Sequence, residues 1–106
     1  MNTPDKLISI KKGLLEFVVL TVIAKDRVYS ADILKTLAST EFATQEGTLY
    51  PLLSSLRREG AVEYEWVESE AGPPRKYYKL TVKGTEQLAM LQQYWDEINQ
   101  TIKKLQ

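Results

Sequence analysis

Few side chains in this sequence are suited to acid–base or metal chemistry. It contains no cysteine and no histidine, which excludes disulfides, thiolate nucleophiles and sites built on imidazole. The remaining candidates are carboxylates spaced i, i+2 on one strand face, Glu63 with Glu65 and Glu68 with Glu70. Catalysis by a carboxylate pair needs two different environments, whereas the flanking residues indicate a single solvated edge. We therefore expect no enzyme, no cofactor and no metal.

Hydrogen-bonding side chains gather at the head of the segment EGTLYPLLSSLRREG, residues 46–60. If this segment faces DNA, Gln45 is able to contact a base edge, and Thr48 and Tyr50 are able to donate to phosphates. The alternative is structural, with Thr48 capping a helix, Gln45 as ordinary surface and Tyr50 packed on the domain. The residues alone leave both interpretations open.

Basic residues are the second requirement of a DNA-binding surface, because phosphate contacts dominate affinity. The net charge is zero, with 14 basic and 14 acidic side chains, so a basic face depends on where the side chains point. Arg75 and Lys76 follow a turn and lie on opposite faces of a strand, so we expect only one of them, preferably Arg75, to face DNA closely. Lys12 and Arg58 are weaker candidates for phosphate contacts.

Three helices are predicted before the strands. Residues 6–25 are apolar around nearly the whole circumference, so this helix must be covered on two sides, and a partner chain is the simple solution. Residues 30–39 show the stripe of a short amphipathic helix with Ser30 as its N-cap. The third helix ends at Gly60. The short second and third helices form a pair like that of a helix-turn-helix.

The start of the third helix depends on Pro51, because proline lacks the backbone donor that an interior position uses. If the helix begins near Thr48, Pro51 lies in the first turn and no hydrogen bond is lost. If it begins at Gln45, Pro51 removes one bond and bends the helix. The spacing of the leucines is compatible with both starts.

The periodicity then changes from helical to alternating. In VEYEWVE, residues 62–68, Val, Tyr and Trp66 alternate with Glu, Glu and Val, as in a half-buried strand. SEAGPP, residues 69–74, is a turn by composition, and RKYYKL, residues 75–80, is a second strand. The sequence therefore predicts a two-stranded β-hairpin with a six-residue loop.

Residues 81–106 are predicted as a last helix, capped by Thr81 and weakened early by Gly84. This helix, roughly 37 Å long at 1.5 Å per residue, exceeds what one small domain needs. Its apolar residues recur as in a coiled-coil seam, and we expect the seam to form a homodimer interface. The seam residues are Leu88, Leu91, Trp95, Ile98, Ile102 and Leu105.

The chain is predicted to form one domain over residues 1–106, with a DNA-binding part at 5–80 and a dimerisation helix at 81–106. The longest apolar run, residues 17–23, is far shorter than the ~20 residues that span a bilayer. It is interrupted by Thr21 and lacks a small-residue cleavage site. We therefore expect a cytoplasmic location without contact to a membrane.

Three helices followed by a hairpin is the order of a winged helix-turn-helix, a mostly helical α+β fold. In that architecture the third helix enters the major groove, and the hairpin, or wing, lies beside it on the backbone or minor groove. Winged helices also serve as protein-interaction modules. A module that does not bind DNA is therefore the alternative.

Three motifs resemble the PadR family of transcriptional regulators, namely KGLLEFVVL at 12–20, EGTLYPLLSSLRREG at 46–60 and GPPRKYYKLTVKG at 72–84. The resemblance covers about residues 11–98, including Trp95, and one helix after the wing is similar to the small subfamily. The chain departs from the family pattern at Ser30 and Ala31, where glycine and an aromatic residue are usual.

The resemblance implies a homodimeric regulator, most simply a repressor of a nearby operon, bound to a palindromic operator in double-stranded DNA. It implies that Gln45, Thr48 and Tyr50 face that DNA. Several members of the small subfamily respond to flat aromatic drugs, so a planar aromatic effector is expected between the two Trp95 indoles of a dimer. A small-molecule carrier is a weaker alternative. The residues expected to line the effector site are Phe17, Thr21, Gln87, Leu91 and Trp95.

Overall fold

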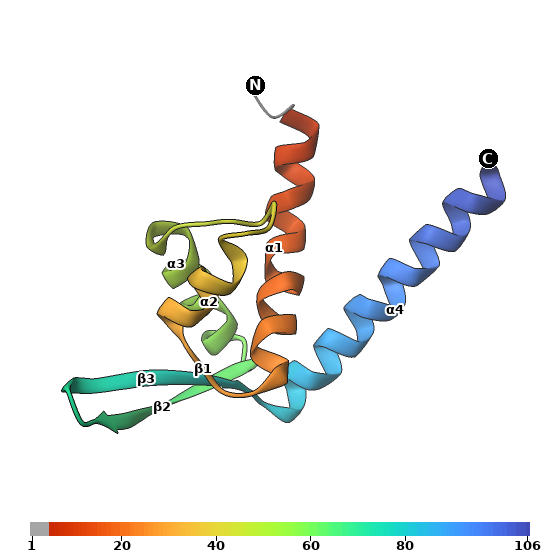
Figure 1. Ribbon diagram of the computed structural model, residues 1–106. Helices are drawn as coiled ribbons and strands as arrows, with labels where there is room; N and C mark the ends of the chain where they lie inside the picture. The colour runs from red at the N-terminus through yellow and green to blue at the C-terminus, as the bar shows by residue number, and fades with distance from the viewer. Residues whose placement is uncertain (1–4) are drawn as a thin grey trace.

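Helices and strands follow one another in the order expected for a winged helix (Figure 1). The computed structural model describes residues 5–106, so the first four residues of the predicted domain lie outside that range. No helix of the described chain is both long and apolar enough to cross a membrane. The mostly helical α+β fold is confirmed. Its elements are α1 (Asp5–Lys25), β1 (Val28–Tyr29), α2 (Ser30–Leu37), α3 (Glu46–Arg58), β2 (Val62–Ser69), β3 (Gly72–Leu80) and α4 (Val82–Leu105).

The core lies where α1, α2 and α3 pack against one face of an antiparallel sheet (Figure 1). The strand order is β1-β3-β2, so β3 is the central strand. Each helix contributes aliphatic side chains at helical spacing, and Tyr78 closes the core from the sheet. The buried residues are Val19, Leu20, Ile23, Ile33, Leu37, Leu49, Leu53, Leu56, Ala61, Val62 and Tyr78.

The helix α3 begins at Glu46, with Gln45 as its extended N-cap residue. The Gln45 carbonyl accepts from the backbone N–H of Leu49 at 2.9 Å. Pro51 therefore lies inside the helix and not in its first turn. Of the two starts that the sequence left open, the earlier one is right. The carbonyl of Gly47 lacks its usual i+4 donor, because proline has no backbone N–H.

The same helix ends in a Schellman motif. The backbone N–H of Gly60 donates to the carbonyl of Arg57, and that of Ala61 donates to the carbonyl of Leu56. Gly60 takes a φ of 81°, which glycine adopts without steric cost. The predicted stop at Gly60 is confirmed, and this tight end leads the chain directly into β2.

The start of α2 differs from the prediction. Ser30 is not the N-cap but the first helical residue, and Tyr29 holds the N-cap position without a side-chain hydrogen bond. The Ser30 hydroxyl donates to the Tyr50 hydroxyl of α3 at 3.5 Å instead of serving its own helix. The two residues before Ser30 form β1 by pairing with Tyr78 and Tyr77 of β3. This pairing depends on residues distant in sequence, which is why local pattern missed the strand.

The wing is longer and its loop is shorter than predicted. The expected six-residue loop at 69–74 is wrong, because Ser69 pairs with Gly72 across a two-residue turn. The pairing of β2 with β3 is irregular between Val67 and Ser69, where the register shifts. The prolines at 73–74 belong to β3. They are tolerated there because β1 does not extend alongside this end of β3.

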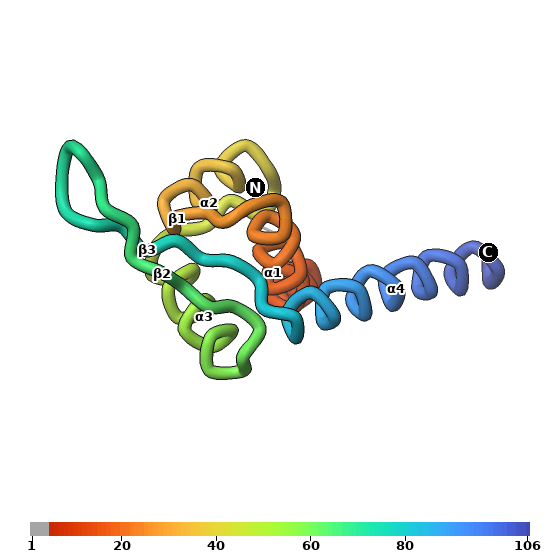
Figure 2. The backbone as a smooth tube through the Cα atoms, turned by 90° about the horizontal axis from the view of Figure 1, so that it is seen from below, coloured from red at the N-terminus to blue at the C-terminus, as the bar shows by residue number. Residues whose placement is uncertain are grey.

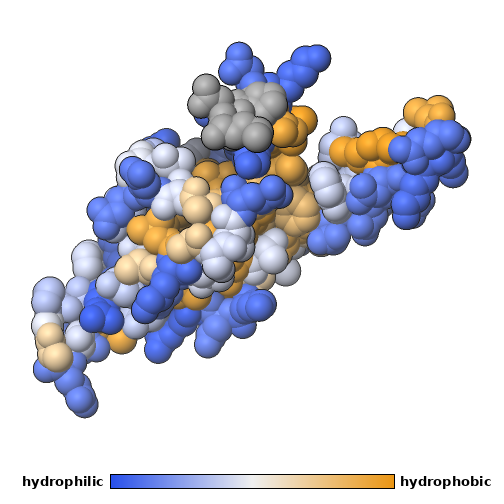
Figure 3. Space-filling view, turned by 45° about the horizontal axis from the view of Figure 1, so that its top comes forward, coloured by the Kyte–Doolittle hydropathy of each residue, from blue (hydrophilic) through white to orange (hydrophobic). Residues whose placement is uncertain are grey.

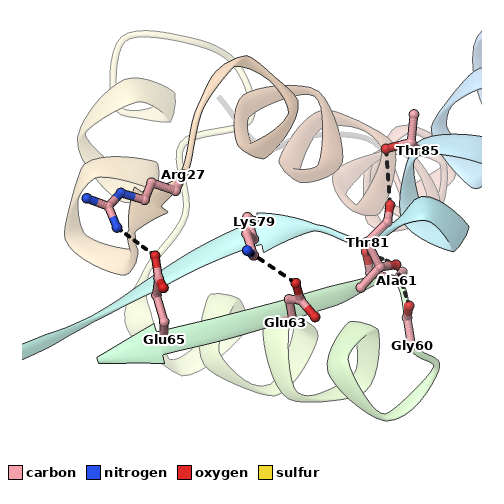
Figure 4. A network of polar contacts seen from close by, with 8 residues as sticks. All are labelled: Arg27, Gly60, Ala61, Glu63, Glu65, Lys79, Thr81 and Thr85. Carbon is pink, nitrogen blue, oxygen red and sulfur yellow. Dashed lines mark hydrogen bonds and ion pairs between the residues drawn. The ribbon is translucent and has the colours of Figure 1, made fainter. Parts of the chain in front are cut away.

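Polar contacts join the end of α3 to the start of α4 (Figure 4). Thr81 is the N-cap of α4, as predicted, and its hydroxyl accepts from the backbone N–H of Gly84 at 2.9 Å. The same hydroxyl donates to the carbonyl of Gly60 at 2.6 Å. The backbone N–H of Thr81 donates to the carbonyl of Ala61 at 3.1 Å. We call Gly60, Ala61, Thr81 and Gly84 the α3–α4 junction.

Gly84 is a requirement of the junction and not the weak point that helix propensity predicts. Gly84 is buried, and a Cβ added to it would lie 1.9 Å from the carbonyl oxygen of Ala61. The first turn of α4 can approach the neighbouring backbone this closely only because glycine has no side chain.

The helix α4 leaves the domain after its first turns (Figures 1 and 2). Leu88 and Leu91 pack against the core, whereas Ile102 is 49% and Leu105 is 81% exposed. The molecule is consequently elongated, with extents of 56 × 37 × 21 Å. The apolar seam predicted for this helix therefore has an inner part covered by its own domain and an outer part left bare.

Replacing Gly84 with alanine tests the junction. Alanine favours an open helix by up to ~1 kcal/mol, but here the added methyl group must displace the Ala61 carbonyl. We expect Gly84→Ala to lower the free energy of unfolding by about 1–3 kcal/mol, measured by urea denaturation at one protein concentration. Gly47→Ala is the matched control, since nothing lies within 4 Å of a Cβ added there. Unchanged stability of Gly84→Ala would contradict the role assigned to this glycine.

Candidate nucleic-acid interface

The outward face of α3 is polar and carries two of the predicted DNA-binding residues. The three buried leucines of this helix turn toward the core, while Thr48 and Arg58 are exposed. Successive residues of an α-helix are about 100° apart, so Arg58, Pro51 and Ser54 lie opposite the leucines, and Thr48 lies at the border of that side, about 60° from Pro51. Gln45 is exposed at the N-terminal end of the same helix. The structure therefore brings Gln45 and Thr48 to one exposed helix end.

Tyr50 lies on a different side of α3 from Thr48. Two positions along a helix correspond to a rotation of about 200°, so the two side chains point away from one another. Tyr50 is 43% exposed, and its hydroxyl contacts Ser30 at the start of α2. Arg57 follows Tyr50 by two helical turns and shares its flank. This flank faces the wing, as the contact of Arg57 with Tyr64 shows.

The outer face of the wing, turned away from the helices, carries paired charges (Figure 4). Arg27 Nη1 lies 2.6 Å from Glu65 Oε1, and Lys79 Nζ lies 3.4 Å from Glu63 Oε1. Both ion pairs found within residues 5–106 are on this face. Glu63 and Glu65 of β2 therefore have basic partners within the chain. Their negative charges do not cancel the positive charges on the other face of the wing.

Arg75 and Lys76 lie on opposite faces of β3, as strand geometry predicts. Arg75 is on the outer face, where its Cζ lies 4.8 Å from the ring centre of Tyr29. Lys76 is on the helix-facing side, where its Nζ lies 4.3 Å from the ring centre of Tyr64 and 5.5 Å from that of Trp66. These distances are those of cation–π contacts. The lysine, and not the arginine, is therefore beside α3.

Basic and aromatic side chains form a row from α3 along the helix-facing side of the wing. Arg57 Cζ lies 4.7 Å from the ring centre of Tyr64, which Lys76 also contacts. Trp66 ends the row and is 64% exposed, so the burial expected on this face of the strand does not extend to it. We call Arg57, Tyr64, Lys76 and Trp66 the wing row. Sequence reasoning missed Arg57, although its two-turn spacing from Tyr50 was a usable signal.

Beneath the wing row, Tyr78 connects the wing to the core. Its ring centre lies 5.8 Å from that of Tyr64. Burial is the main cause that raises the pKa of the Tyr78 hydroxyl, the neighbouring phenols of Tyr64 and Tyr50 raise it further, and Arg57 lowers it. Tyr78 therefore stays neutral at physiological pH and supports the row as an aromatic packing residue.

Lys12 lies on α1, beside the connection from α2 to α3. Together with Lys11, Glu41 and Phe42 it surrounds a shallow pocket of about 190 Å³. Lys12 is exposed and lies next to the segment that leads into α3. It is not part of the wing row.

A groove between α1 and α4, bordered on one side by α2, brings together four of the five residues predicted to bind an effector. Phe17, Thr21 and Trp95 line a depression of about 410 Å³, and Phe17, Leu91 and Trp95 line an adjoining one of about 420 Å³. We call these two depressions the α1–α4 groove. The Thr21 hydroxyl already donates to the carbonyl of Phe17 at 2.8 Å within its own helix. The fifth residue, Gln87, lines neither depression.

Gln87 lies instead beside Glu16 of α1. Burial raises the pKa of the Glu16 carboxyl, the charge of Glu59 raises it further, and a hydrogen bond with Gln87 lowers it. Gln87 thus contributes to the contact between α1 and α4 close to the junction. Within residues 5–106, no group of acidic side chains is arranged to hold a metal ion.

Comparison with known proteins finds relatives that span nearly the whole chain. A family model described as "Transcriptional regulator PadR-like family" matches residues 19–90. The chain is similar to a PadR-like transcription factor from Bacteroides fragilis, with 41% identity and a TM-score of 0.83 over 97% of this chain and 100% of that one. It is also similar to a PadR-like transcriptional regulator from Bacillus cereus, with 36% identity and a TM-score of 0.82 over 92% and 95% of the two chains.

An uncharacterized protein of Lysinibacillus sphaericus is 27% identical over 94 residues, which is 86% of either chain. The region matched by the family model contains α2, α3, both wing strands and the α3–α4 junction. These matches confirm the resemblance that the three sequence motifs indicate. The chain belongs to the PadR-like family and is therefore a DNA-binding transcriptional regulator and not an enzyme.

Proposed function

We propose that the protein acts as a homodimeric repressor whose two α3 helices enter successive major grooves of a palindromic operator. The observation that carries this proposal is the exposed polar face of α3, with Gln45 and Thr48 at its free N-terminal end. Thr48 is placed to donate to a phosphate and Gln45 to contact a base edge. Repression follows where the operator overlaps a promoter, because the bound dimer excludes the polymerase.

The dimer is proposed from the bare part of α4. Trp95 is 40% exposed and Ile102 is 49% exposed, and Ile10 of α1, 54% exposed, lies across the same groove. Figure 3 shows apolar surface on both α1 and α4. A second copy that lays its α4 into the α1–α4 groove buries both surfaces at once, because a two-fold axis repeats helix and groove. In this proposal residues 5–80 form the DNA-binding part and residues 81–106 the dimerisation helix.

The α1–α4 groove is also the place where we propose that a planar aromatic effector binds. The exposed Trp95 indole offers a flat stacking surface beside Phe17, and the two-fold axis brings a second indole toward it. A ligand held there changes the separation of the two α3 helices, because α4 is joined to α3 at the junction. The dimer with ligand and the dimer without it then differ in the separation of their α3 helices. Operator affinity differs between the two for this reason.

Thr48→Ala tests the DNA-binding face of α3. Loss of one hydrogen bond to a charged phosphate is expected to weaken operator binding by ~1.5 kcal/mol, near tenfold. The measurement is fluorescence anisotropy with duplexes from the region upstream of the gene, repeated over a range of salt, where affinity must fall steeply. Ser39→Ala, exposed in the turn after α2, is the control and should bind like the wild type.

Unchanged affinity of Thr48→Ala would remove this residue from the DNA face. Failure of the wild type to bind any promoter duplex at low salt would support the alternative, a winged-helix module that binds protein and not DNA. A reporter gene placed downstream of a promoter region that the protein binds distinguishes repression from activation. The proposal expects higher reporter expression when the regulator is deleted.

Ile102→Glu tests the dimer. Ile102 is half exposed in the single chain, so its replacement leaves the fold intact, but a carboxylate in an apolar interface costs about 2 kcal/mol or more. We expect light scattering to show a dimer for the wild type and a monomer for Ile102→Glu, with weaker operator binding. Gln100→Glu adds the same charge about 200° around the helix and should remain dimeric. A wild type that is monomeric at micromolar concentration would refute the interface.

Tryptophan emission tests the effector site, using proflavine as a planar probe in the absence of DNA. The chain contains two tryptophans, so Trp66→Phe leaves Trp95 as the only emitter. We expect saturable quenching of this emission by proflavine, because the dye stacks on the indole. In the otherwise unchanged protein, Trp95→Ala should reduce the effect of proflavine more than it reduces DNA binding. The reverse result would reassign Trp95 to the dimer core.

A further inference from the structure

The connection between α2 and α3 runs beside α1 (Figure 1), and its residue Phe42 reaches the surroundings of Trp95. Phe42 is half-buried and packs against the edge of the core. It lines a depression of about 220 Å³ together with Phe17, Val18 and Trp95, which all line the α1–α4 groove as well. We call this depression the Trp95 pocket. A planar molecule stacked on Trp95 therefore reaches the side chain of Phe42.

A second pocket adjoins the same phenylalanine. It is the pocket of about 190 Å³ beside Lys12, which we call the Lys12 pocket. The two linings share Glu41, which is exposed, and Phe42. On α1, Leu15 lines the Lys12 pocket and Leu14 lines the Trp95 pocket, and neighbouring residues of a helix are about 100° apart. Phe42 is therefore the half-buried side chain that separates the two pockets.

The Lys12 pocket has room for a phenyl ring. An apolar cavity of about 150 Å³ holds benzene, and the Lys12 pocket is larger than that. Its lining includes Ile8 and Leu15, and lysines present apolar stems to such a surface. The ring of Phe42 thus meets apolar surface in either pocket. Side chains change position between discrete rotamers, so Phe42 has two distinct states that a ligand can bias.

Movement of Phe42 reaches α3 because the chain between them is short. Before Phe42 the connection is fastened, since the Thr40 hydroxyl donates to the Leu37 carbonyl at 2.8 Å and accepts from the Phe42 N–H at 3.0 Å. After it, the N–H groups of Thr44 and Gln45 donate to no backbone carbonyl of the described chain. Gln45 is the N-cap residue of α3. The end of α3 proposed to face DNA is therefore free to follow Phe42.

We propose that Phe42 couples the effector site to α3 within one subunit. A planar aromatic molecule on Trp95 fills the Trp95 pocket and moves the Phe42 ring into the Lys12 pocket. The connection then carries Gln45 away from the position in which it meets a base edge, and operator affinity falls. The inference rests on the proposed effector site and deepens it, because this route does not pass through α4 and the α3–α4 junction.

The test measures the response of the full-length protein, defined as the operator Kd with proflavine divided by the Kd without it. A duplex labelled in the far red avoids the emission of the dye, and Trp95→Ala reports what the dye does to DNA alone. We expect a wild-type response of about fivefold or more and a response below about twofold in Phe42→Ala. Trp95 emission of Phe42→Ala, measured together with Trp66→Phe, should still be quenched by proflavine.

Two further variants separate coupling from folding. Ile8→Phe keeps Phe42 but fills the Lys12 pocket from its rim, where Ile8 is 40% exposed, and it should also lower the response. Leu34→Ala is the matched control, because Leu34 is half-buried against the core as Phe42 is but lines neither pocket. It should keep the wild-type response. Thermal unfolding shows that each variant is folded at the temperature of the binding measurement.

The outcomes separate this inference from the proposed function. A wild-type response in Phe42→Ala or in Ile8→Phe would overturn the inference, because the effect would then run through α4 and the junction, while the proposed effector site stands. Loss of quenching in Phe42→Ala would make Phe42 a binding residue, and loss of the response in Leu34→Ala would indicate a general loosening of the domain. Both results would also overturn the inference.

The wild type alone tests the proposed effector control. If proflavine changes the operator affinity of the wild type no more than that of Trp95→Ala, this control fails, and the coupling through Phe42 fails with it.

Discussion

The close approach of α4 to the backbone of Ala61 fixes how α3, the wing and α4 are arranged relative to one another. The contact is made by backbone atoms and by one hydroxyl, that of Thr81, so neither side can shift without losing hydrogen bonds. The strands of the wing are tied to the same place, because β2 starts directly after Ala61 and β3 ends directly before Thr81. The orientation of α3, the wing and α4 relative to one another therefore follows from this one junction.

A feature of the fold could be predicted where residues close in sequence determine it, and it was missed where distant residues determine it. The stop at Gly60 and the cap at Thr81 need only neighbouring residues, and both were predicted from residue type. Ser30 was misassigned because its hydroxyl turns to a tyrosine on another helix. The prediction for Gly84 used helix propensity alone. A glycine is needed there because the Ala61 carbonyl, far away in sequence, lies too close for a side chain. The start of α3 stayed open because Pro51 is compatible with two helix starts and the choice is made by backbone geometry.

In the candidate site, too, the features set by nearby residues were predicted and those set by distant parts of the fold were not. The sequence identified Gln45 and Thr48 as polar groups at a helix start, and the structure places both at one exposed end. It also anticipated that a strand separates Arg75 from Lys76. It could not tell which of the two lies beside α3, because that depends on which face of the sheet the helices cover. The exposure of Trp66 was missed for a related reason, since alternation along a strand does not reveal where the covering helices end.

The prolines at 73–74 have a consequence for how the protein behaves in quantity. Beyond Tyr77, β1 no longer covers β3, so this part of the wing has an open edge. An open edge is a template to which a strand from another molecule can add, as in domain-swapped or fibrillar assemblies. Successive prolines withhold the backbone donors that such a strand would need. This end of β3 can therefore remain without a neighbour on its β1 side and still not serve as a template for a strand from another copy.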